Sequence, residues 1–141
     1  MLPTLPLGSL FIGELIGKEV ILETYHGINS SLYSIQSFNM ESVNMVLENL
    51  DIAKKIEIVN SLFVENHLET DKTKVLALNN LHEIADKIKN ELDEIKKDLD
   101  FCKTLYFSYF RSKPYFEKLK KLERHSKILD SRLDLYLRIS N

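Results

Sequence analysis

Four histidines and one cysteine are the side chains of this sequence best suited to metal binding or nucleophilic catalysis. No histidine has a neighbour at metal-ligand spacing, and Cys102 has no second thiol. The sequence also lacks a glycine-rich phosphate loop, a nucleophile elbow and a His-Glu-x-x-His pair. We therefore expect no enzymatic activity, no metal and no cofactor. The four histidines are His26, His67, His82 and His125.

A basic segment that follows several aromatic residues is the strongest candidate for binding chemistry. Aromatic and basic side chains together are typical of surfaces that bind single-stranded nucleic acid. Several of these aromatics also fit a packed helical hairpin, and residues 1–70, with three basic and nine acidic side chains, would repel phosphate. We favour a solvated helix face and retain nucleic-acid or partner binding as the alternative. The basic candidates are Lys118, Lys120, Lys121, Arg124 and Lys127.

The elements that position these residues are two helices. From Leu78 to Tyr109, apolar residues recur at alternating steps of three and four, which predicts a long helix with one apolar seam. Pro114 favours a break and a new helix, which runs to about Ile139. The apolar seam of this second helix matches the seam of the first helix when the chain folds back near Ser112. We expect an antiparallel hairpin over residues 70–141, with Ile95 beside Leu129 and Leu99 beside Ser126.

The first helix is predicted to be longer than the second. Its N-terminal end then has apolar side chains with no partner in the hairpin, and exposed apolar patches mark interaction surfaces. Either the N-terminal domain or a second chain would cover them. We therefore predict a protein interface at Val75, Leu76, Leu78 and Leu81.

The N-terminal half has shorter apolar runs. Residues 19–25, 32–38, 43–49, 56–59 and 62–64 are predicted as the strands of a small five-stranded β-barrel over residues 1–69. One alternative stays open, because Met40, Val43, Leu47 and Leu50 are also spaced as one face of a helix. Residues 10–16 fit a short helix or a strand. The predicted fold class is α+β, a barrel followed by a helical hairpin.

The run Leu15-Ile16-Gly17-Lys18-Glu19-Val20-Ile21-Leu22-Glu23 resembles the opening helix-to-strand segment of the Sm/Lsm family, with Gly27 at the place of a later glycine. Residues 37–49 are similar to that family's second motif. This resemblance, over residues 10–68, implies an SH3-like barrel. Of the family's RNA-binding positions, it carries over one, Asn44. Asn39 stands where the family has Asp, and the family's last Arg-Gly pair is missing. A PRC-type barrel is the rival, which implies an archaeal-type cell-division scaffold.

Together these patterns predict a non-enzymatic assembly or adaptor protein that binds protein partners or copies of itself. An Sm-like nucleic-acid-associated protein is the alternative. No apolar run reaches the roughly 18 residues of a membrane span. A single cysteine fits a reducing compartment, so we expect a cytoplasmic location.

Overall fold

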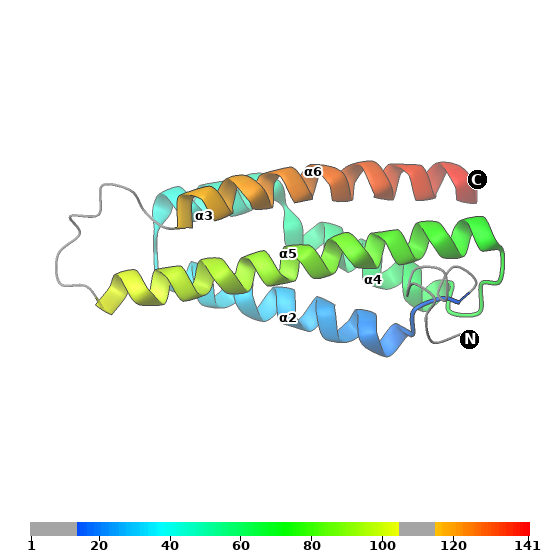
Figure 1. Ribbon diagram of the computed structural model, residues 1–141, viewed down its shortest axis with the longest axis horizontal. Coiled ribbons are helices and arrows are strands. Elements are labelled where there is room, and N and C mark those ends of the chain that lie inside the picture. Colours follow the sequence, from blue (N-terminus) through cyan, green and yellow to red (C-terminus); the bar gives the residue numbers. More distant parts are fainter. Residues whose placement is uncertain (1–13, 105–114) are drawn as a thin grey trace, which may run out of the picture.

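The computed structural model describes residues 14–104 and 115–141, and these residues form five helices and no strand. The helices lie side by side in an elongated bundle (Figure 1). Their bounds are α2 (Lys18–Gln36), α3 (Glu41–Leu50), α4 (Ile52–Glu65), α5 (Lys72–Thr104) and α6 (Tyr115–Ser140).

The five helices form four columns, because α3 and α4 follow one another along the same side of the bundle (Figure 1). Helix α5 packs between α6 and α2. It is antiparallel to α6, since Lys118 pairs with Asp98 while Arg132 pairs with Glu83. It is parallel to α2, since Thr24 of α2 lies near His82 of α5 and Ser31, further along α2, donates a hydrogen bond to Asp93, further along α5. The fourth column, α3 and α4, packs against α2 and α6 and, through α4, against α5.

The predicted β-barrel is wrong, and so are the Sm/Lsm-like and PRC-type resemblances that implied it. Residues 18–36 form one helix whose buried positions recur every three or four residues. Two of those positions hold Thr24 and Ser31, so a search for apolar residues misses the helical period. Gly27, which suggested a turn, lies within α2 where the Lys89 side chain crosses it; a Cβ there would lie 2.4 Å from Lys89 Cε.

Residues 40–65 follow the helical alternative. Val43 and Leu47 are buried on one face of α3, as the spacing of three and four requires. Asp51 ends α3 and begins α4 in the left-handed conformation, with φ 53°, which Asp and Asn tolerate better than most residues. Asn39, between α2 and α3, has φ 57°. These two residues divide the polypeptide into short helices without glycine or proline.

The apolar seam of α5 is buried as predicted through the described residues, from Leu78 to Leu99. Its continuation at Tyr106 and Tyr109 lies outside them. The buried face is wider than the seam, since Ile84 and Glu91 are buried too. A wider face follows because α5 contacts three columns rather than one helix. Side chains from all five helices meet in one core.

The hairpin is present as α5 and α6, but its predicted register is wrong. The sequence pattern pairs Leu99 with Ser126, whereas His125, the residue before Ser126, contacts Glu91. Helix α6 therefore lies about eight residues, or ~12 Å at 1.5 Å per residue, further toward the N-terminal end of α5. Apolar residues still meet apolar residues because a heptad pattern repeats, so the pattern alone does not select one register.

This register removes the predicted overhang. Val75, Leu78 and Leu81 are fully buried within the chain, and Leu76 alone of the four predicted interface residues is exposed, at 44%. Internal packing thus covers most of the surface that the sequence assigned to a partner. In the described ranges, no helix has the length and apolar character needed to cross a membrane.

Candidate functional site

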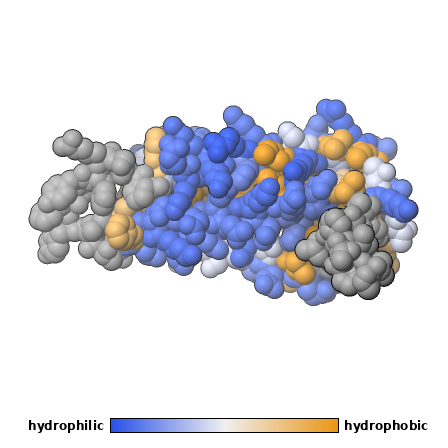
Figure 2. Space-filling model, viewed as in Figure 1, coloured by the Kyte–Doolittle hydropathy of each residue, from blue (hydrophilic) through white to orange (hydrophobic). Residues whose placement is uncertain are grey.

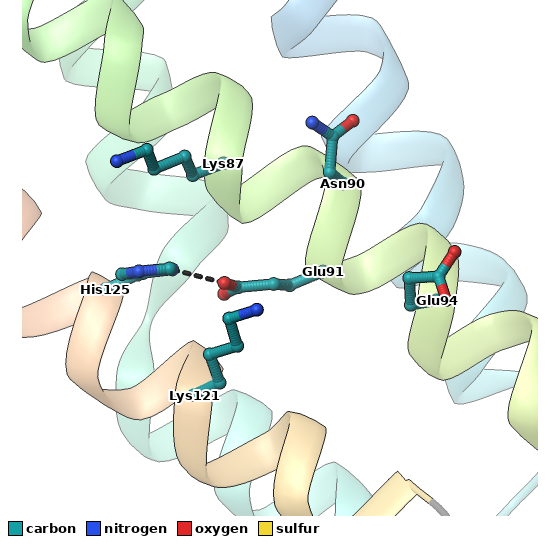
Figure 3. A pocket seen from close by; sticks show the side chains of 6 residues that line it. All are labelled: Lys87, Asn90, Glu91, Glu94, Lys121 and His125. Atoms are coloured by element: carbon teal, nitrogen blue, oxygen red, sulfur yellow. Dashed lines mark ion pairs between the residues drawn. The ribbon is translucent and has the colours of Figure 1, made fainter.

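A polar pocket opens on the seam between α5 and α6. Its volume is about 420 Å³. Figure 3 shows Glu91 of α5 and His125 of α6 facing one another across it, with Lys121 beside them. The pocket therefore brings a buried carboxylate next to exposed charged side chains of both helices. The lining residues are Lys87, Asn90, Glu91, Glu94, Lys121 and His125.

Glu91 is the most unusual residue of the pocket, because it is a carboxylate at 7% exposure. Its Oε2 atom contacts His125 Nδ1, an ion pair when the imidazole is protonated, while its Oε1 atom is buried and has no hydrogen-bond partner among the described residues. Burial raises the pKa of Glu91, opposed by His125, Lys121 and Arg124. A buried carboxylate loses hydration, so its neutral form is favoured relative to an exposed one.

Ion pairs at both ends of the pocket join the same two helices. Toward one end Lys118 Nζ lies 2.8 Å from Asp98 and 3.4 Å from Glu94, and the hydrogen bond to Asp98 raises the pKa of Lys118. Toward the other, Arg132 Nη1 donates to Glu83 and to the Asn80 carbonyl, each at 2.8 Å. These contacts flank the pocket and hold α6 in its register.

The buried carboxyl of Glu91 can exchange a proton. No cluster of three or more His, Cys, Asp or Glu side chains suited to a metal occurs in the described part of the chain. Cys102, half-buried in α5, lies outside the residues that line the pocket. The pair of Glu91 and His125 has no hydroxyl or thiol among the lining residues to activate.

Four of the five basic candidates form one exposed surface. Lys120, Arg124 and Lys127 lie on the side of α6 away from its buried residues, and Lys121 lies at the edge of this side, where it also lines the pocket; we call these four residues the basic face. None of the four has an ion-pair partner among residues 14–104 and 115–141, and Lys120 lies 5.0 Å from the Phe116 ring centroid. The fifth candidate, Lys118, instead forms ion pairs with Glu94 and Asp98 of α5.

The remaining predicted residues lie elsewhere. Asn44 is half-buried within helix α3, rather than in a barrel loop as predicted, and its Oδ1 atom is buried and unpaired among the described residues. His82 approaches Thr24 of α2 at 3.4 Å, and burial lowers the pKa of His82. His26 is exposed on α2 and His67 is exposed after α4, so the histidines do not gather.

Glu91 was missed because the sequence shows it as one of many charged residues on a charged helix. It directly precedes the seam residue Leu92, on the edge of the apolar stripe. That position gave a weak signal, since edge residues are buried where a neighbouring helix packs beside the seam. The packing of the whole bundle decides which edge of the apolar stripe is covered, and the local sequence pattern does not contain this information.

Comparison of the chain with protein-family models, with curated proteins and with solved structures finds no match.

Proposed function

We propose that this chain is a non-enzymatic assembly protein that binds other copies of itself through the basic face of α6. The observation that carries the proposal is the basic face, in which four neighbouring exposed cations, three of them on the outward side of the helix, form no ion pair with the described residues. Other cations of α6 do find partners within the chain, as Lys118 and Arg132 do.

The distribution of charge supports a second copy as the partner. Helix α6 has seven basic and four acidic residues, whereas the stretch from α2 to α4 has three basic and seven acidic residues. The chain therefore has a positive and a negative region of comparable size. Complementary potentials increase association rates and fix the orientation of partners.

Such a contact joins different surfaces of two identical chains. Head-to-tail contacts of this kind build rings when the rotation closes and filaments when it does not. The surface that contains α5 between α6 and α2 is mostly hydrophilic, with small apolar patches (Figure 2). This favours a polar, salt-sensitive contact over a large apolar one.

The test is the triple variant Lys120→Glu, Lys121→Glu and Arg124→Glu, compared with the unchanged protein by sedimentation velocity at 20 mM and 500 mM salt. We expect wild-type assemblies at low salt that dissociate at high salt, and a variant that stays monomeric at both. Far-UV circular dichroism checks that the variant is folded.

A matched control changes the net charge equally but leaves α6 intact: Lys18→Glu, Lys54→Glu and Lys72→Glu, all exposed. It should still assemble. A wild-type monomer at every concentration, or an assembly unaffected by the α6 variant, would contradict the proposal.

Nucleic acid remains the alternative partner, favoured by the exposed Phe116 beside Lys120. A short single-stranded RNA added to the same samples separates the two. RNA binding that the α6 variant loses, without any self-association of the wild type, would support this alternative. We also propose a cytoplasmic location, from the single cysteine.

A further inference from the structure

We infer that the basic face of one copy receives helix α3 of another copy, through a strip formed by Glu41, Met45 and Glu48. This inference rests on the proposed function, since it names the partner surface of the same assembly contact. We call these three residues the acidic strip.

The acidic strip lies opposite the buried side of α3. Val43 and Leu47 are 0% and 4% exposed, whereas Met45 is 54% exposed and both glutamates are exposed. Neither glutamate has an ion-pair partner in the part of the chain that the structure describes. The strip is therefore an unpaired negative surface with an exposed apolar centre.

The spacing of charges matches between the two surfaces. Glu41 and Glu48 are seven residues apart, as are Lys120 and Lys127. Seven residues are two helical turns, so both pairs lie on one side of their helix at about 10.5 Å. Two helices laid together in either direction then bring both glutamates to both lysines.

The centre of the contact is suited as well. Met45 lies between the glutamates, and Arg124 lies between the lysines. The flexible thioether side chain of methionine adapts to irregular surfaces, and the aliphatic stem of arginine is apolar. The one apolar residue of the strip thus faces a surface on which it can pack.

The two surfaces cannot meet within one chain. Helix α3 packs toward α6 and the core through Val43 and Leu47, and α6 packs inward through Leu119 and Leu122. The acidic strip and the basic face lie on the opposite, outward sides of these helices. The contact is therefore between chains, and each copy offers one surface of each kind.

Other acidic residues fit less well. Glu57 of α4 lies 4.0 Å from Lys54 of its own helix. On α2, Glu19 and Glu23 are four residues apart, with Lys18 adjacent. Neither set offers two unpaired carboxylates at the seven-residue spacing of the lysines.

The experiment uses two neutralised variants of the full chain. One has Lys120→Gln and Lys127→Gln, and the other has Glu41→Gln and Glu48→Gln. We expect each alone to self-associate roughly tenfold more weakly at low salt, as two exposed charge pairs imply. Mixed together, they should form a 1:1 dimer that does not grow, because one intact surface of each kind remains and these two pair.

The matched control is Glu57→Gln with Glu65→Gln on α4, which should assemble like the wild type. Light scattering after size-exclusion chromatography measures every mass, and circular dichroism confirms folding. An α3 variant that assembles normally, while the α6 variant does not, overturns this inference and leaves the proposed function standing. An α6 variant that assembles normally overturns both. Two variants that each lose assembly but do not dimerise when mixed also overturn the inference.

Discussion

Replacing Glu91 by glutamine should change how the stability of the bundle depends on pH. Burial raises the pKa of Glu91 above its value in the unfolded chain. Between those two pKa values the folded state binds more protons than the unfolded state, so the free energy of unfolding falls as the pH rises. The stabilising contribution of the neutral carboxyl is therefore complete below about pH 4.5 and is lost as the pH passes the folded pKa.

The size of this effect has an upper limit. One proton per molecule corresponds to at most about 1.4 kcal/mol for each pH unit. With a urea m value near 3 kcal/mol/M, at the upper end for small proteins, this is a shift in the midpoint of about 0.5 M urea per pH unit. The Glu91→Gln variant has no titrating carboxyl group at this position, so its urea midpoint should not show this fall with rising pH.

The assay is urea unfolding followed by far-UV circular dichroism at half-unit steps from pH 4 to pH 7. A salt concentration of 500 mM suppresses the proposed assembly and screens a buried pair much less. The quantity of interest is the wild-type midpoint minus the variant midpoint at each pH. Burial lowers the pKa of His82, which therefore adds stability as the pH rises toward 6.5, but His82 is present in both proteins and cancels in the difference.

Glu94→Gln is the control with the opposite sign. Hydrogen bonds from Lys118 and then Lys97 lower the pKa of Glu94, so its stabilising contribution is present above about pH 4.5 and is lost as the pH falls. If the difference between wild type and Glu91→Gln does not fall with rising pH, the buried carboxyl does not have the raised pKa on which this reasoning depends.

Two further predictions test the register and the core. Cysteines placed at Leu92 and Leu122 should cross-link within one chain under mild oxidation, because His125 contacts Glu91 and Lys118 contacts Asp98. Cysteines at Ile95 and Leu129, the pair that the sequence pattern favours, should cross-link poorly. The reverse result in non-reducing gels would support the register predicted from the sequence. Leu81→Ala should lower the free energy of unfolding by about 2–5 kcal/mol because Leu81 is fully buried, whereas Leu76→Ala, at an exposed position, should lower it by less than about 1 kcal/mol. Urea titrations measure both changes, and equal losses would show that the two positions are packed alike.

The candidate site was only partly predictable. The basic residues of α6 follow from composition and spacing, and Lys120, Arg124 and Lys127 do share one exposed side. The pocket was not found, because Glu91 and His125 are 34 positions apart and meet only when α5 and α6 pack in one register. The acidic strip does not follow from the predicted strand over residues 43–49, which contains Glu48 but not Glu41 and so does not place the two carboxylates on one face.

Local sequence pattern accounts for the two long helices and their apolar faces. Alternating steps of three and four residues fit a helix and no other regular structure, and the buried residues of α5 and α6 follow them. Local pattern did not decide α2, where Thr24 and Ser31 occupy buried positions and find partners in His82 and Asp93 of α5. It also did not decide the register of α6, since a heptad repeat is equivalent to itself after each shift of seven. Tertiary structure decided both, because the partners that satisfy buried polar groups and flanking charges are distant in sequence and are fixed only by packing.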